Sequence, residues 1–360
     1  MASPQPKPGI LEITAYVGGK SKAPAGVKPI KLSSNEGALG PSPKAMAAYQ
    51  AATADLHRYP DGGATAIRQA IGKRYGLDPA RIVCGAGSDE LIALLTKAYA
   101  GPGDQVLYSQ HGFLMYPIAA KGVGATPVAV PEIRLAADID ALLAAVTPAT
   151  RILYLANPNN PTGTLLPKDQ IDRLHAGLPG HVLLVLDAAY AEYVDRNDYD
   201  PGTELASKAD NVVMLRTFSK IHALAALRLG WAYGPPAVID VLNRLRGPFN
   251  VGLPTQAAGI AALEDQPFVD AVKAHNDIWR PWLAAALTKL GLEVVPSVAN
   301  FLLVRFKDAA AASAAYQFLE QRGVIVREMG GYGLGDCLRI TIGTEDECRA
   351  VADGLAAHFA

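Results

Sequence analysis

Short, nearly continuous apolar segments recur through the first two thirds of this chain, and they restrict its fold more than any other feature. Each is bounded by Gly, Pro, Asn or Asp, as expected of strands that are covered on both faces. Helical patterns separate most of them, so we expect an α/β domain with a mostly parallel sheet, right-handed crossovers and helices on its faces. The expected strands are residues 81–84, 105–108, 125–130, 151–156, 182–186 and 212–215, and the expected helices are residues 43–56, 64–75, 139–146 and 168–177 and a helix from Glu90.

The pattern changes after about Leu253 and predicts a smaller α+β domain. Two long helical stretches come first, and shorter strands and helices follow them. These are helices at residues 256–262, 268–290 and 309–321 and from Glu345, and strands at residues 292–295, 301–304, 324–326 and 338–342. We therefore divide the chain into an N-terminal arm that is part of the small domain (residues 1–44), a large domain (45–252) and a small C-terminal domain (253–360).

Composition and charge exclude several classes of protein. The formal net charge is −1 and half of the residues are apolar, which argues against a surface for nucleic acid or anionic membranes. No apolar run reaches the roughly 20 residues that span a bilayer, and the first residues do not resemble a secretory signal. Cys84, Cys337 and Cys348 are scattered, so we expect reduced thiols in a cytoplasmic protein, with no disulfide and no metal site.

Polar residues stand where the predicted strands end, which is where open α/β sheets bind ligands. The turn Gly85-Ala-Gly87-Ser88-Asp89 follows a strand and opens a helix. Free backbone N–H groups at such a turn can bind a phosphate, and Gly87 would let the backbone approach it closely. The same residues are also ordinary chemistry for a turn, and both interpretations stay open.

A carboxylate, a phenol and an amide follow further along the chain. Asp187 ends an apolar run and could pair with the nitrogen of a pyridine ring, or could simply cap a helix. Tyr190 could donate a hydrogen bond to a phenolate oxygen on such a ring, or could belong to the core. Asn160 could donate to the same oxygen, although Asn160-Pro-Thr-Gly163 is also a plain turn.

Lys220 lies just past the last strand of the large domain, between hydroxyl groups and an arginine. A lysine attacks an aldehyde only when it is neutral, so burial or positive neighbours would have to lower its pKa. Thr217 and Ser219 could donate hydrogen bonds to a phosphate, and Arg228 offers a planar fork for two of its oxygens. A lone lysine is usually a solvated surface residue, but this order and spacing indicate a pocket for pyridoxal phosphate.

These residues resemble the fold-type I pyridoxal phosphate aminotransferases and, among them, the histidinol-phosphate branch. The resemblance covers nearly the whole chain. Its motifs are Leu32-Ser-Ser-Asn35-Glu36 with Gly40-Pro-Ser-Pro43, Arg58-Tyr59-Pro60-Asp61, Gly85-Ala-Gly-Ser-Asp-Glu90, Asn157-Pro-Asn-Asn-Pro-Thr-Gly163, Thr217-Phe-Ser-Lys220 and Leu338-Arg339-Ile-Thr-Ile-Gly343.

The resemblance implies a role for each residue. Lys220 would bind the cofactor covalently and move the proton, with Asp187 and Tyr190 as its partners in catalysis. Tyr59 would reach the cofactor phosphate of a partner subunit, which implies a homodimer with shared active sites. The residues that would hold the cofactor are Gly87, Ser88, Asp89, Phe113, Asn160, Asp187, Tyr190, Thr217, Ser219, Lys220 and Arg228, with Phe113 stacked on the ring, and those that would bind substrate are Tyr16, Asn35, Arg327 and Arg339.

The activity implied is transamination between glutamate and imidazole-acetol phosphate, or histidinol phosphate and 2-oxoglutarate in reverse, in histidine biosynthesis. An aromatic amino acid aminotransferase or a threonine-phosphate decarboxylase would share the cofactor residues, and both stay open. The family usually has an aromatic residue two positions after the lysine, where this chain has His222. We expect His222 to be a wall residue near the cofactor entrance, or else to tune specificity or a local pKa.

Overall fold

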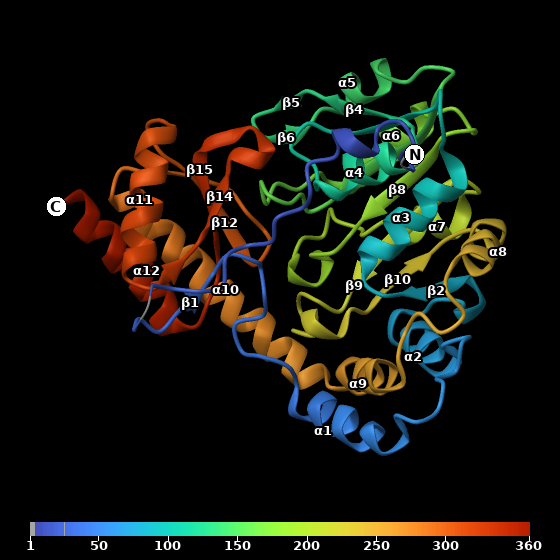
Figure 1. Ribbon diagram of the computed structural model, residues 1–360, viewed down its shortest axis with the longest axis horizontal. Helices are drawn as coiled ribbons and strands as arrows, with labels where there is room; N and C mark the ends of the chain where they lie inside the picture. Colours follow the sequence, from blue (N-terminus) through green and yellow to red (C-terminus); the bar gives the residue numbers. More distant parts are fainter. Residues whose placement is uncertain (1–3, 25) are drawn as a thin grey trace.

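Strand β8 (Leu183–Asp187) lies at the centre of a seven-stranded sheet in the computed structural model, which describes residues 4–24 and 26–360 (Figure 1). The strand order is β2-β10-β9-β8-β7-β3-β4, and the pairs from β9 to β4 are all parallel. The expected α/β domain with a mostly parallel sheet is confirmed. The other strands of this sheet are β2 (Ile82–Gly85), β3 (Gln105–Ser109), β4 (Thr126–Val130), β7 (Thr150–Ala156), β9 (Val212–Thr217) and β10 (Gly230–Tyr233).

Strand β10 is the one strand of the seven-stranded sheet that the sequence pattern did not predict. It runs antiparallel to both of its neighbours, β2 and β9. Its apolar run is only Trp231 to Tyr233, between two glycines, and so gives no strand signal. Gly230 is required because a Cβ there would lie 2.4 Å from the backbone nitrogen of Ser88.

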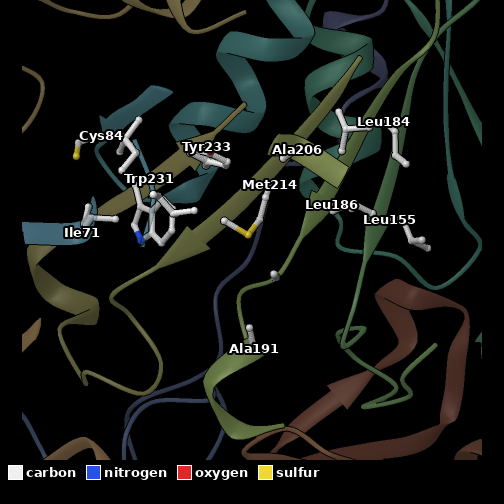
Figure 2. Close-up of a cluster of buried hydrophobic side chains, with 14 of the residues drawn as sticks. Ile71, Cys84, Leu155, Leu184, Leu186, Ala191, Ala206, Met214, Trp231 and Tyr233 are labelled. Atoms are coloured by element: carbon white, nitrogen blue, oxygen red, sulfur yellow. The ribbon is translucent and has the colours of Figure 1, made fainter. Parts of the chain in front are cut away.

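Alternate residues of the central strands enter two cores on opposite faces of the sheet, as side chains of a strand do. In β8, Leu184 and Leu186 join the core drawn in Figure 2, whereas Leu183 and Val185 join the core on the other face. Helices α2 (Thr65–Tyr75), α5 (Ile139–Ala144), α6 (Lys168–Gly177), α7 (Thr203–Lys208) and α9 (Leu253–Glu264) contribute to the first core, and α3 (Ser88–Tyr99), α4 (Met115–Gly122) and α8 (Pro236–Leu245) contribute to the second.

The smaller domain has its own sheet and core. Four antiparallel strands run in the order β11-β12-β15-β14, and α10 (Gln266–Lys289), α11 (Ala309–Gln321) and α12 (Glu345–Phe359) contribute to its core. These strands are β11 (Glu293–Val295), β12 (Phe301–Arg305), β14 (Arg327–Met329) and β15 (Leu334–Thr341). Helix α12 begins with a complete capping box between Thr344 and Glu347, which satisfies two backbone donors at the helix start.

Part of the N-terminal segment packs against the sheet and core of the small domain. Strand β1 (Ile30–Lys31) pairs in parallel with β13 (Val324–Ile325), and Leu32 is buried in the core of the small domain. In Figure 1 this segment, in blue, runs between the two sheets before it enters α1 (Pro43–Ala52). Ser42 caps α1, with Pro43 at its first position. A hairpin of β5 (Glu132–Ile133) and β6 (Ala136–Ala137) completes the strands.

The division between the two domains at residues 252 and 253 stays a prediction. Ala258, Ala262 and Leu263 of α9 are buried in the core of the large domain, whereas Leu283 and Leu287 of α10 are buried in that of the small one. This packing favours a later division, within α10. Among the described residues, none of the helices has both the length and the apolar character needed to cross a membrane.

Candidate active site

A cavity of about 280 Å³ lies beyond the carboxyl ends of β7, β8 and β9, and both domains contribute to its walls. Every predicted site residue lines it except Gly87 and Tyr59, although the role of each stays a prediction. The predicted residues that line the cavity are Tyr16, Asn35, Ser88, Asp89, Phe113, Asn160, Asp187, Tyr190, Thr217, Ser219, Lys220, Arg228, Arg327 and Arg339.

One end of the cavity is a cup suited to an anion. Ser88 begins α3, so the free backbone N–H groups and the positive end of the helix dipole lie there. Gly87 has a φ of 85°, and a Cβ on it would lie 2.2 Å from Nη2 of Arg228. A side chain at residue 87 would therefore displace the guanidinium, which explains the glycine even though it lies outside the cavity lining.

Arg228 is held in the cup by polar neighbours. Its Nη2 donates to Oδ2 of Asp89 at 3.1 Å, and its Nη1 donates to Oγ of Ser219 at 3.4 Å. The hydroxyl of Thr217 donates in turn to Ser219 at 3.0 Å. The cup thus combines a guanidinium and two hydroxyl groups, all of which can donate to phosphate oxygens, with one carboxylate that orients the guanidinium.

Asp187 ends β8 and is buried. Its Oδ2 accepts a hydrogen bond from the hydroxyl of Tyr116 at 2.8 Å, and its Oδ1 accepts one from the backbone N–H of Ala189 at 3.3 Å. Burial raises the pKa of Asp187 to about 6, while the bond from Tyr116 acts in the opposite direction. The carboxyl group is therefore mostly ionised at pH 7, and it can pair with a cationic ring nitrogen.

Lys220 is half-buried at the centre of the cavity. Its Nζ lies 3.4 Å from the carbonyl oxygen of Ser34 and 5.7 Å from the ring centroid of Tyr190. Burial, followed by the positive charge of Arg339, lowers the pKa of Lys220 to about 8. A large fraction of this amine is thus neutral near pH 8, as a nucleophile or a general base must be.

The wall next to Lys220 links the two domains through hydrogen bonds. Nη1 of Arg339 donates to Oδ1 of Asn160 at 2.6 Å, and its Nη2 donates to the carbonyl oxygen of Ser33 at 2.9 Å. Nδ2 of Asn35 donates to the hydroxyl of Tyr190 at 2.9 Å. Arg339 is buried, and its Nε has no hydrogen-bond partner among the described residues, so it can still take up an anion.

The outer side of the cavity is formed by the N-terminal segment and β14. Nη2 of Arg327 donates to the carbonyl oxygen of Val17 at 2.6 Å, and Tyr16 meets the ring of Phe113 edge-on at 6.5 Å. Arg327 therefore faces the cavity with further donors while it ties down the segment that covers it.

Tyr59 lies outside the cavity of its own chain. Its side chain is 82% exposed and stacks on Phe249 with ring centroids 4.5 Å apart. An exposed tyrosine of this kind is available to another molecule, so its predicted role in a partner's site stays a prediction.

His222 does not stand where it was expected. It is absent from the residues that line the cavity; its ring is buried and stacks on Phe218, with centroids 5.0 Å apart. Burial lowers the pKa of His222 to about 4, so it is neutral at pH 7. The expectation of a wall residue near the cofactor entrance is wrong, because the chain turns this side chain into the core behind the lysine.

Sequence reasoning missed other residues that shape the site. Tyr116 holds Asp187, and its only sequence signal is its position three residues after Phe113, where both lie on one face if the segment is helical. Glu36 lines the cavity and forms an ion pair with Lys31 at 2.7 Å. Its only sequence signal is its place at the end of the motif Leu32-Ser-Ser-Asn35-Glu36.

The thiols of Cys84, Cys337 and Cys348 are free and buried. The peptide bonds Asn157–Pro158 and Asn160–Pro161 are both cis.

Comparisons with known proteins agree with this geometry. Residues 27–355 match the family model of class I and II aminotransferases. The histidinol-phosphate aminotransferase of Paramagnetospirillum magneticum is 62% identical over 357 residues, which are 99% of this chain and 98% of that protein. The corresponding enzyme of Rhodospirillum centenum is 59% identical over 356 residues, with the same shares covered.

Solved structures place the fold in the same group. The histidinol-phosphate aminotransferase of Sinorhizobium meliloti, solved in complex with pyridoxal 5'-phosphate, has a TM-score of 0.88 and 31% identity, over 92% of this chain and 91% of that one. A single mutant of the aspartate aminotransferase of Thermus thermophilus, at 24% identity and a TM-score of 0.82 over 92% of each chain, shares the fold. The predicted resemblance is confirmed: this chain belongs to the class I and II aminotransferase family and, within it, to the histidinol-phosphate aminotransferases.

Proposed function

We propose that this protein uses pyridoxal 5'-phosphate to exchange an amino group between glutamate and imidazole-acetol phosphate, which yields 2-oxoglutarate and histidinol phosphate. The observation that carries the proposal is the half-buried Lys220, whose pKa is lowered to about 8, between an anion cup and the guanidinium of Arg339. The near full-length similarity to histidinol-phosphate aminotransferases supports the choice of substrates.

The residues present fit the cofactor. The cup of Ser88, Thr217, Ser219 and Arg228 suits a phosphate, and a Cβ at residue 87 would crowd it. At the far side, Asp187 would hold the ring nitrogen. Phe113 would pack on the face of the ring, and Asn160 and Tyr190 would hold its oxygen. When bound, the cofactor supplies an aldehyde that takes the amino group and a ring that stabilises negative charge on the substrate α-carbon.

Lys220 performs the proton transfer in this proposal. Its neutral Nζ would accept the proton from the substrate Cα and then donate it to the former aldehyde carbon of the cofactor, so it would act first as a general base and then as a general acid. The lowered pKa of Lys220 keeps both protonation states accessible near neutral pH. Asp187 stays ionised during these steps because Tyr116 and Ala189 donate hydrogen bonds to it.

Two arginines would hold the two kinds of substrate. Arg339 would bind the α-carboxylate of glutamate, for which its buried guanidinium offers two parallel donors. Arg327, on the more open side, would bind the phosphate of the other substrate. Both arginines line the same cavity, so the two substrates can occupy it in turn.

A substrate panel tests the proposal. Histidinol phosphate, phenylalanine and tyrosine are compared as amino donors to 2-oxoglutarate, and threonine phosphate is assayed for release of carbon dioxide. We expect kcat/KM to be highest for histidinol phosphate, by about tenfold or more, because only this donor presents both an amine and a phosphate to the arginines. A preference for phenylalanine or tyrosine, or release of carbon dioxide without a keto acid, would contradict the proposed substrates.

We infer further that the protein acts as a homodimer in which Tyr59 serves the partner's site. Tyr59 is 82% exposed, and the nearby Leu56 is 65% exposed, which is typical of a surface that another subunit covers. Tyr59→Ala and Lys220→Ala should each impair the enzyme when tested alone. Part of the activity should return when the two variants are unfolded and refolded together. A hybrid dimer has one intact site, so a statistical mixture would regain about a quarter of the wild-type activity. No recovery, with dimers present by light scattering, would refute the shared site.

A further inference from the structure

Tyr116 makes a contact that gives it a part in the site although it does not line the cavity. It lies on α4, its side chain is fully buried, and its hydroxyl donates to Oδ2 of Asp187 at 2.8 Å. Asp187 is itself buried at the end of β8. The hydroxyl therefore contacts the carboxylate on the side away from the cavity, and the other side of Asp187 lines the cavity.

The packing of its ring determines where this hydroxyl points. The ring of Tyr116 stacks on Tyr154 with centroids 4.7 Å apart and planes 4° apart, and it meets Phe113 edge-on at 6.0 Å. The hydroxyl of Tyr154 lies elsewhere, 2.9 Å from Oγ1 of Thr96 and 3.0 Å from the carbonyl oxygen of Ile92. Of the two stacked tyrosines, only Tyr116 donates a hydrogen bond to Asp187.

The structure assigns Tyr116 as the positioning residue of the carboxylate that meets the cofactor nitrogen. Its hydroxyl orients Asp187 and keeps it ionised inside an apolar setting. This inference rests on the proposed function, because the ring nitrogen of pyridoxal phosphate is the group that Asp187 would hold.

The electrostatics of Asp187 support the assignment. Burial raises its pKa to about 6, and the hydrogen bond from Tyr116 is the largest effect that lowers it. Asp89 raises this pKa and Lys220 lowers it, and the buried phenols Tyr154, Tyr190 and Tyr199 also interact with Asp187. Tyr116 keeps its proton because burial and the negative charge of Asp187 raise its pKa well above the ordinary value. Tyr116 is therefore the donor in its hydrogen bond to the Asp187 carboxylate.

Removal of the hydroxyl should make Asp187 a weaker acid. A hydrogen bond to a charged group commonly shifts an equilibrium by about tenfold or more, so the pKa of Asp187 should rise by about one pH unit in Tyr116→Phe. About half of the Asp187 carboxyl groups would then be protonated at pH 7, and a protonated carboxyl group does not pair with a cationic nitrogen.

The first experiment titrates Asp187 in the protein without cofactor, by carboxyl ¹³C NMR. Tyr116→Phe should raise the pKa of Asp187, and the matched control Tyr154→Phe, which keeps the stack and the bond from Tyr116, should not change it. An unchanged titration in Tyr116→Phe, or an equal rise in both variants, would overturn the assignment. This measurement requires no cofactor, so it decides the role of Tyr116 even if the proposed function fails.

The second experiment measures the Kd of pyridoxal 5'-phosphate by absorbance at pH 7 and at pH 9. Tyr116→Phe should weaken binding about twofold or more at pH 7 and leave it unchanged at pH 9, where Asp187 is ionised in both proteins. In an Asp187→Asn background, the same substitution should have no further effect. An equal loss at both pH values, or in that background, would show that Tyr116 acts through packing and would refute the proposal. A wild-type protein that does not bind the cofactor would overturn the proposed function itself.

Discussion

The buried ion pair between Arg216 and Glu192 offers a test of what holds the site together. Arg216 precedes Thr217 on β9, and Glu192 follows Tyr190 beyond β8, so the pair connects the two segments that carry site residues. Nη2 of Arg216 lies 2.7 Å from Oε1 of Glu192, and the two side chains are only 5% and 11% exposed. Nε of Arg216 and Oε2 of Glu192 have no hydrogen-bond partner among the described residues, and Oε1 of Glu192 accepts a second, longer bond from the hydroxyl of Tyr75 at 3.5 Å.

Glu192→Gln would leave the guanidinium buried without a counter-charge. Breaking a buried pair in this way costs about 3–5 kcal/mol of the free energy of unfolding. We expect about 3 kcal/mol, because the amide oxygen of the new side chain can still accept a hydrogen bond from Arg216. The faces of Tyr75 and Trp231, at 4.8 and 5.6 Å from the guanidinium carbon, remain in place and do not replace the lost charge.

Urea unfolding followed by circular dichroism measures this loss, provided that the slope against urea stays unchanged. The matched control is Asp240→Asn, which breaks an exposed pair with Arg244 and should leave the free energy of unfolding nearly unchanged. The double variant Glu192→Gln/Arg216→Met should recover most of the stability, because it removes the orphaned charge as well. If the double variant is as unstable as Glu192→Gln alone, packing accounts for the loss and our reasoning about charge is refuted.

Other predictions concern the cavity directly. Lys220→Ala should abolish the absorbance of covalently bound cofactor and all turnover while the circular dichroism spectrum stays unchanged, and retained turnover would contradict the role of Lys220. Since burial lowers the pKa of Lys220 to about 8, the amine loses its neutral form below this pH, so stopped-flow absorbance should show covalent attachment slowing about tenfold per pH unit as the pH falls. Arg339→Ala should lower kcat/KM for glutamate about ten- to hundredfold and affect histidinol phosphate far less, because only glutamate has an α-carboxylate, and equal losses would count against this assignment. Gly87→Ala should weaken pyridoxal 5'-phosphate about tenfold but not pyridoxal in equilibrium titrations, because the new methyl group displaces the guanidinium of Arg228; equal weakening of both would show a general distortion of the site.

The large sheet was predictable because its central strands are buried on both faces and therefore apolar along their whole length. Strand β8, for example, needs both Leu184 and Val185 to fill two cores. Strand β10 begins at a glycine and is followed by Gly234 and Pro235, which are typical of a turn, and Gly230 permits its close contact with Ser88. That requirement arises from tertiary structure, which a local pattern does not contain.

The site was predictable in its residue types and only partly in its contacts. The order of Asp187, Lys220 and Arg228 indicates cofactor chemistry, and the structure brings all three to one cavity. The acceptors at Ser33 and Ser34 are backbone carbonyl groups, which no side-chain pattern reveals. Two further contacts depend on how helices and loops pack: the bond from Tyr116 to Asp187 and the burial of His222.

The position of β10 between β2 and β9 has a consequence for how the protein is made. Among the described residues, strand β2 pairs with β10 alone, and β10 follows it by more than half of the large domain's sequence. During translation, β2 is therefore synthesised well before β10, and Ser88 well before Arg228. A nascent chain that stops before β10 should expose an open edge of the sheet, which would make the chain prone to aggregation and dependent on chaperones. Pyridoxal 5'-phosphate would bind only after β10 has inserted into the sheet.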